Sequence, residues 1–147
     1  MQLSTPKDLS VNIVLIDDDD IDALGVARAL KKAKANNTLF RARDGVEAIS
    51  LLNQPEVISK PFLILLDLNM PRMNGIEFLD QIRSDSQLAN SVVFIFSTSN
   101  EAQDKSAAYK RNVAGYIVKN SQHDGFYSVI DMLDHYWQIV ELPECSV

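Results

Sequence analysis

Short apolar runs alternate along the chain with longer segments whose apolar residues recur at helical spacing. Four runs have the length and composition of buried strands, at residues 13–16, 62–66, 92–96 and 113–118. A fifth segment, residues 39–43, alternates apolar and basic residues in part, which is typical of an edge strand. The run at residues 62–66 is the most apolar, and it predicts a central strand.

The segments between and after these runs predict helices at residues 21–35, 45–53, 76–83, 101–111 and 126–140. In the first helix Leu24, Ala27 and Leu30 fall on one side, and the last carries a long apolar stripe. Each strand needs a crossover helix to return in the same direction, so the alternation implies parallel pairing. The pattern therefore predicts an α/β fold: a doubly wound five-stranded parallel sheet with helices on both faces.

Length, charge and cysteine content narrow the functional classes. The 147 residues fit a single domain, residues 1–147, with a core from about residue 11 to residue 140. A net charge of -6 and a pI near 4.8 argue against a nucleic-acid surface, because phosphate contacts need clustered Lys and Arg. The longest apolar runs have five residues, too few to span a membrane. The opening segment does not read as a signal peptide and Cys145 is the only cysteine, so we expect a cytoplasmic protein.

Residues that can do chemistry stand where the strand candidates end. Asp17 and Asp18 follow the first strand, Asp67 the third, Ser97 the fourth and Lys119 the fifth. In an open parallel sheet, ligands bind in the crevice outside the carboxyl ends of the strands. We therefore expect these residues to converge, although they are far apart in sequence.

Three carboxylates held close together repel one another unless a cation neutralises them. An all-oxygen ligand set suits Mg²⁺, which keeps several waters and leaves room for phosphate oxygens. A lysine and a serine beside the metal could then hold a phosphoryl group by charge and by a hydrogen bond. An aspartate carboxylate can itself accept that group and become an aspartyl-phosphate.

Four segments together resemble the successive motifs of the response-regulator receiver family: IVLIDDDD, LLDLNMPRMNG, VVFIFST and GYIVK. The resemblance covers the chain from about residue 11 to residue 140. It implies the flavodoxin-like receiver fold, with the strand order 2-1-3-4-5. It also implies a function in two-component signalling, in which a histidine kinase or a phosphotransfer protein supplies the phosphoryl group.

The same resemblance assigns roles to the acidic residues and to the loop that follows the third strand. Asp67 matches the phosphoacceptor of the family. Asp18 matches the residue that binds Mg²⁺ directly, and Asp17 matches a residue that assists largely through water. The main-chain carbonyl of Asn69 would complete the protein's share of the metal ligands.

Three residues on the last two strands match the family's phosphoryl contacts and its switch. Ser97, preferred over Thr98 for its spacing to Lys119, matches the hydroxyl residue that contacts the phosphoryl group. Lys119 matches the cationic partner of that group. Tyr116 matches the aromatic switch residue, which turns inward when the Ser97 hydroxyl moves toward the phosphate.

The sequence departs from most receivers at one position and resembles a subfamily at two others. Asn120 follows Lys119 where most receivers have Pro, which leaves open whether that peptide bond is cis. The acidic opening DDDDID and the ending HYWQIVELP are similar to single-domain regulators of phytochrome-type histidine kinases. Only seven residues follow Val140, so we expect a stand-alone, non-enzymatic regulator that assists its own phosphorylation and slow dephosphorylation. Such receivers often form homodimers through the fourth helix, the last strand and the last helix.

Three alternatives explain part of the pattern. An EF-hand loop starting at Asp18 fails, because Ala23 and Ala29 occupy its glycine and glutamate positions. A haloacid-dehalogenase-like phosphatase would use Asp17 as the nucleophile and Asp19 as the acid/base, but it leaves LLDLNMPRMNG without a role. A degenerate receiver-like interaction module is disfavoured, because all the expected site residues are present.

Carboxylates also favour helix N-termini, so parts of the acidic run need no function. We interpret Asp19, Asp20 and Asp22 in this way, as a solvated acidic loop with a helix N-cap.

Overall fold

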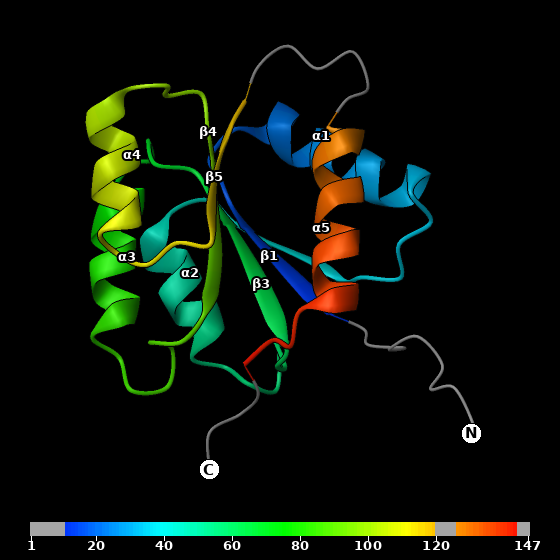
Figure 1. The fold of residues 1–147 in the computed structure, drawn as a ribbon. Coiled ribbons are helices and arrows are strands. Elements are labelled where there is room, and N and C mark those ends of the chain that lie inside the picture. The colour runs from blue at the N-terminus through cyan, green and yellow to red at the C-terminus, as the bar shows by residue number, and fades with distance from the viewer. Residues whose placement is uncertain (1–10, 120–125, 144–147) are drawn as a thin grey trace.

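The computed structural model describes residues 11–119 and 126–143. Five parallel strands form one sheet in the order β2-β1-β3-β4-β5 (Figure 1). The strands are β1 Asn12–Ile16, β2 Leu39–Ala42, β3 Phe62–Leu66, β4 Val92–Ser97 and β5 Gly115–Val118. This arrangement confirms the predicted α/β class, the strand order and the central place of residues 62–66.

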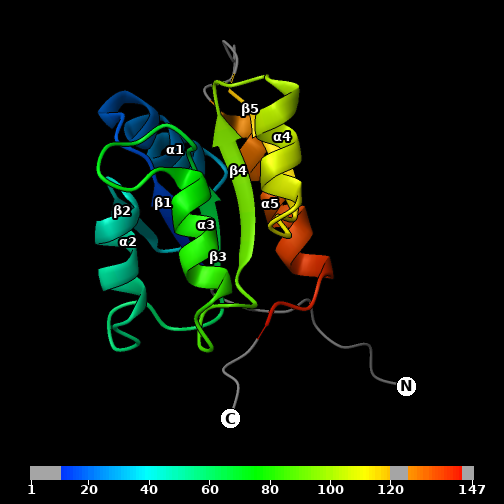
Figure 2. The ribbon, with the colours of Figure 1, turned by 90° about the vertical axis from the view of Figure 1, so that its left-hand side faces the viewer.

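Five helices cover the two faces of the sheet: α1 Asp20–Lys32, α2 Gly45–Leu52, α3 Gly75–Arg83, α4 Ala102–Tyr109 and α5 Tyr127–Ile139. Helices α2, α3 and α4 lie on one face, and α1 and α5 lie on the other (Figure 1). Figure 2 looks onto the face that α2, α3 and α4 cover. None of the helices in the described part of the chain is both long enough and apolar enough to cross a bilayer.

Strand β3 shows why the sheet needs apolar residues on both of its faces. All five of its residues are buried. Ile64 and Leu66 belong to the core under α2, α3 and α4, while Leu63 and Leu65 belong to the core under α1 and α5. Because successive side chains point to opposite faces, a strand covered on both sides must be apolar throughout.

Helix α1 packs through a different face from the one that the sequence predicted. Leu24 and Ala27 are exposed, whereas Val26, Ala29 and Leu30 are buried. The prediction was therefore right for Leu30 and wrong for the other two. Val26, Ala29 and Leu30 pack in the core shared with α5, so the buried stripe is turned away from Leu24 and Ala27.

Candidate functional site

The acidic residues that follow β1 and β3 come together at the carboxyl ends of these neighbouring strands. Asp17, Asp18 and Asp67 each offer a carboxylate oxygen, and these oxygens lie within 4.8 Å of one another. Asp17 is fully buried, Asp67 is nearly so, and Asp18 is exposed. Close carboxylates of mixed burial, one of them open to solvent, form a hard oxygen ligand set that fits a divalent cation.

The sheet itself holds the two buried carboxylates in place. The backbone N–H of Asp17 donates to the carbonyl of Ala42, and that of Asp67 donates to the carbonyl of Ile16, at 3.0 and 2.9 Å. Both residues thus continue the hydrogen bonding of their strands by one position. Asp67 also accepts a long hydrogen bond of 3.4 Å from the backbone N–H of Asn69, the exposed residue at the start of the next loop.

Lys119 brings a positive charge into this acidic cluster. Its side chain is 6% exposed, and its Nζ lies 2.6 Å from Asp17 Oδ2, 2.8 Å from Asp22 Oδ2 and 3.8 Å from Asp67 Oδ2. Its backbone N–H donates to the carbonyl of Ser97 at 2.7 Å, which ties the ends of β5 and β4 together. The Lys119–Asn120 bond lies outside the described residues.

Asp22 is the site residue that the sequence reading missed. Its carboxylate accepts a hydrogen bond from Lys119, so the interpretation of Asp22 as a solvated residue is wrong. Asp19 is the N-cap of α1, as expected, and accepts from the N–H groups of Ile21 and Asp22. That cap places Asp22 in the first turn of the helix, beside the end of β1. The helix start was the available signal in the sequence. The contact itself could not be predicted, because Asp22 and Lys119 are 97 positions apart in the chain.

Burial and charge perturb the titration of the cluster. Burial raises the pKa of Asp67 from 3.8 to about 6, although nearby Lys119 lowers it. Burial also raises the pKa of Asp17, against the opposing hydrogen bond from Lys119. For Lys119, burial acts to lower the pKa, but the hydrogen bonds to Asp17 and Asp22 outweigh it and the pKa is raised.

Ser97 and Tyr116 are linked through the loop between β4 and α4. Ser97 ends β4 and is fully buried, and its Oγ accepts a hydrogen bond of 3.2 Å from the N–H of Ser99. The hydroxyl of Tyr116, on β5, donates to the carbonyl of Ser99 at 2.8 Å. Ser99 in turn donates from its own hydroxyl to Asp104 in α4. Ser97 thus reaches Tyr116 and α4 through a single residue.

Asp20 lies outside the carboxylate cluster of Asp17, Asp18 and Asp67, as predicted from the sequence. Its carboxylate pairs with Arg41 at 2.6 Å and with Arg43 at 3.1 Å, both on the β2 side of the sheet. The hydrogen bond from Arg41 lowers the pKa of Asp20. Arg41 also donates from Nε to the carbonyl of Asp17, so this pair braces the loop between β1 and α1.

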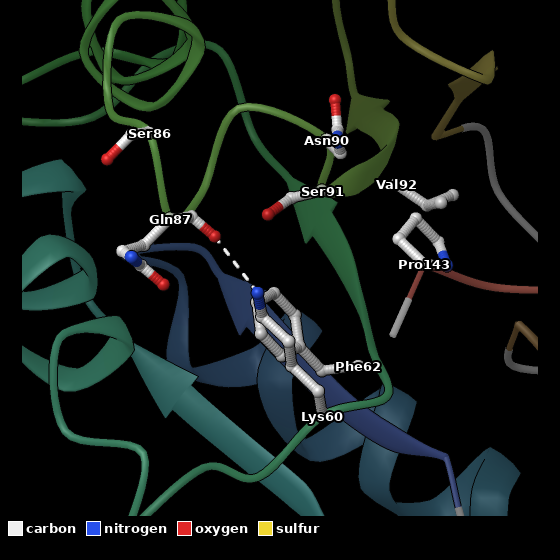
Figure 3. Close-up of a pocket in the computed structure, with 8 residues that line it drawn as sticks. All are labelled: Lys60, Phe62, Ser86, Gln87, Asn90, Ser91, Val92 and Pro143. Atoms are coloured by element: carbon white, nitrogen blue, oxygen red, sulfur yellow. Dashed lines mark hydrogen bonds between the residues drawn. The ribbon is translucent and has the colours of Figure 1, made fainter. Parts of the chain in front are cut away.

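A small hollow lies at the other end of the strands, where β3 and β4 begin, and it is lined by different kinds of residue (Figure 3). It holds about 30 Å³, room for one or two waters, and Lys60 Nζ donates across it to the carbonyl of Gln87 at 3.0 Å. Its lining contains no carboxylate, histidine or cysteine. This hollow therefore lacks the acidic groups that gather at the carboxyl ends of the strands.

The chain matches one family model and several known proteins. The model of the response regulator receiver domain matches residues 13–131. The response regulator Rcp1 of Synechocystis sp. is 31% identical over 135 residues, which cover 89% of this chain and 92% of that protein. A crystal structure of Rcp1 in its Mn²⁺-bound form has a TM-score of 0.77 and 31% identity, over 90% of this chain and 99% of that one.

A second structural relative is the phosphorylated cyanobacterial phytochrome response regulator RcpA. It has a TM-score of 0.82 and 30% identity, over 92% of this chain and all of its own. The expected similarity to phytochrome response regulators is thereby confirmed, and the haloacid-dehalogenase-like alternative receives no support. The all-oxygen cluster agrees with a divalent metal site of the receiver type. The chain belongs to the response-regulator receiver domain family of two-component signalling.

Proposed function

We propose that Asp67 accepts a phosphoryl group in a reaction that requires Mg²⁺ held by Asp17, Asp18, Asp67 and the carbonyl of Asn69. One observation carries this proposal. The Asp67 carboxylate, at the end of the central strand, lies among two further carboxylates and 3.8 Å from the Lys119 ammonium. When bound, Mg²⁺ would neutralise the carboxylates and coordinate an oxygen of the incoming phosphoryl group.

The chain's own residues have distinct parts in the transfer. Asp67, with a pKa of about 6, is mainly ionised at neutral pH and can act as the nucleophile. Its oxygen forms a bond to phosphorus while the bond from phosphorus to the donor's histidine nitrogen breaks, and that nitrogen keeps the electron pair. Lys119 and the Ser97 hydroxyl supply a charge and a hydrogen bond to the phosphoryl oxygens.

The proposed output is a change of shape around the fourth helix. A phosphoryl group that draws the Ser97 hydroxyl toward itself would move Ser97 Oγ away from Ser99 N–H, from which it accepts a hydrogen bond. Because the Tyr116 hydroxyl holds the Ser99 carbonyl, a shift of this loop also frees or moves the tyrosine ring. A local charge would in this way bias a two-state surface formed by α4, β5 and α5.

That surface also fits the proposed homodimer. Tyr109 on α4 and Met132 and Ile139 on α5 are large apolar residues that stay exposed. Trp137 is 2% exposed, so it belongs to the core and not to a surface. Sedimentation with and without beryllofluoride tests the dimer: we expect association to tighten with the mimic, and a monomer under both conditions would refute it.

The proposed partner is a sensor histidine kinase or a phosphotransfer protein. The proposed place of action is the cytoplasm, where ATP is available to kinases. No nucleic acid and no membrane enter the proposal. We propose that the domain is not an enzyme that turns over a substrate. It assists its own phosphorylation and slow dephosphorylation.

Intact-mass analysis after incubation with acetyl phosphate and Mg²⁺ tests the function. We expect a gain of one phosphoryl group, mapped to Asp67 and absent in Asp67→Asn. The exposed Asp80 provides a matched control, since Asp80→Asn should be labelled like the wild type. A label that maps to Asp17, or one that persists in Asp67→Asn, would refute the assignment.

The metal ligands have a separate test in two neighbouring aspartates. Asp18→Ala should remove most Mg²⁺ binding in calorimetric titration. Asp20→Ala should retain most of it, because that carboxylate is engaged by Arg41 and Arg43. Equal losses in the two variants would show that the acidic run binds the metal as a unit.

A further inference from the structure

The loop between β3 and α3 carries both Asp67 and Asn69, and its base is closed tightly. The N–H of Gly75 donates to the carbonyl of Leu68 at 3.0 Å. A Cβ on Gly75 would lie 2.5 Å from the carbonyl oxygen of Asp67, so only glycine allows this close return of the chain. Asn74 then starts α3 with a capping box. Residues 69–73 form the tip of the loop between these two fixed ends.

A buried carboxylate on the neighbouring segment holds that tip. Arg72 Nε lies 2.6 Å from Asp44 Oδ2, and Arg72 Nη2 lies 3.1 Å from Asp44 Oδ1, a two-pronged contact. The Asp44 side chain is 4% exposed and caps α2 by accepting from the N–H of Glu47. Arg72 has a left-handed backbone with φ of 60°, which persists only where neighbouring contacts enforce it.

Two further contacts join the same segments. The N–H of Gly45 donates to the carbonyl of Met73 at 3.2 Å. The Met73 side chain packs so closely on Gly45 that a Cβ there would lie 2.6 Å from its sulfur. Asp44 and Gly45, at the start of α2, therefore hold residues 72 and 73 through an ion pair, a backbone hydrogen bond and side-chain packing.

We propose that Arg72 and Asp44 are positioning residues for the metal: their ion pair fixes the loop that presents the Asn69 carbonyl. This inference rests on the proposed function, in which that carbonyl is a ligand. Mg²⁺ requires near-ideal octahedral geometry, so a loop that no longer fixes the position of the Asn69 carbonyl should bind Mg²⁺ more weakly. Groups that orient metal ligands from outside commonly affect affinity about 10–100-fold.

The direction in which Mg²⁺ affinity changes distinguishes a positioning role of the ion pair from a direct effect of its charges on the metal. Arg72→Met removes a positive charge near a cation site, so charge alone would tighten Mg²⁺ binding. Asp44→Asn removes a negative charge, so charge alone would weaken it, while the asparagine can still cap α2. If the ion pair positions the loop, both variants weaken binding. Arg72→Lys keeps the charge but loses the two-pronged geometry, and it should weaken binding as well.

Calorimetric titration of the full chain with Mg²⁺ at pH 8 tests this. We expect about a tenfold weakening for Arg72→Met and for Asp44→Asn, and a smaller one for Arg72→Lys. Arg111→Met is the matched control, because Arg111 pairs with Asp80 at 2.7 Å between α3 and the end of α4. It should bind Mg²⁺ like the wild type. Circular dichroism in EDTA confirms that each variant is folded.

Two results would overturn the inference: opposite shifts for Arg72→Met and Asp44→Asn, or unchanged affinity in both arginine variants. If Asp44→Asn does not fold, the two arginine variants decide, since charge alone predicts tightening in one and no change in the other. Asp18→Ala separates this inference from the proposed function. Full Mg²⁺ binding in Asp18→Ala refutes the metal site itself, whereas loss there with no loss in Arg72→Met refutes only the positioning role.

Discussion

Removal of the Asp67 charge should stabilise the metal-free protein. Asp67 is 7% exposed and is faced by the carboxylates of Asp17 and Asp18 and by the ammonium of Lys119. Burial has the largest effect on the Asp67 carboxyl and outweighs the attraction of Lys119, so the ionised form of Asp67 is disfavoured in the folded state. Asp67→Asn keeps the size of the side chain and an oxygen that can accept from the N–H of Asn69. The substitution therefore removes mainly the charge.

The pKa difference gives the magnitude. The pKa of Asp67 rises from 3.8 to about 6 on folding, and each pH unit between the folded and unfolded values is worth about 1.4 kcal/mol. The full effect is about 3 kcal/mol, and the water that still reaches the site screens it to about 1–2 kcal/mol. Below pH 3.8 both states are protonated and the carboxyl costs nothing. The destabilisation grows as the pH rises toward 6 and is constant above it.

Urea unfolding in EDTA, at pH values from 4 to 8, measures this difference. Asp67→Asn should be more stable than the wild type by about 1–2 kcal/mol at pH 7.5, and the gain should shrink steadily toward pH 4. Added Mg²⁺ should reverse the order, because it stabilises the folded state that binds it. A variant no more stable than the wild type at pH 7.5 in EDTA would refute the reasoning.

Three other substitutions test separate parts of the structure. Arg83 donates to four main-chain carbonyls in two loops, so Arg83→Met should lower the free energy of unfolding by about 2–4 kcal/mol. Urea unfolding measures this, and Mg²⁺ affinity should not change. Tyr116→Phe loses the hydrogen bond to the Ser99 carbonyl and should cost about 1 kcal/mol in the same assay, while phosphorylation of Asp67 continues. Asp22→Asn removes one of the three carboxylates that raise the pKa of Lys119, those of Asp17, Asp22 and Asp67, so that pKa should fall in an NMR titration. An unchanged value would show that Asp17 and Asp67 raise the pKa of Lys119 without help from Asp22.

The sheet and the main site residues could be predicted because both follow from local sequence. A strand buried on both faces needs an unbroken apolar run, as residues 62–66 show. The carboxyl ends of parallel strands share one edge of the sheet, so Asp17, Asp67 and Lys119 converge without any knowledge of side-chain geometry.

The contacts that depend on side-chain direction could not be predicted. Arg72 binds Asp44 across 28 residues, and only the folded loop shows that its backbone turns left-handed at that point. The face of α1 was misjudged for a related reason. Periodicity gives a helical stripe, but which stripe is buried depends on the neighbour, and Val26 and Ala29 in place of Leu24 contact the core shared with α5.

Asp22 changes the charge balance of the site and, with it, the expected order of events. Among the described residues, the ammonium of Lys119 lies near the carboxylates of Asp17, Asp22 and Asp67. The Asp18 carboxylate adds a fourth negative charge, within 4.8 Å of those of Asp17 and Asp67. Four negative charges and one positive charge leave a formal charge of -3 when all are ionised. A phosphoryl donor is itself an anion, and repulsion at close range in a partly buried site is strong. Occupancy of the cation site should therefore precede phosphorylation, so the labelling rate should follow the Mg²⁺ binding curve and vanish in EDTA.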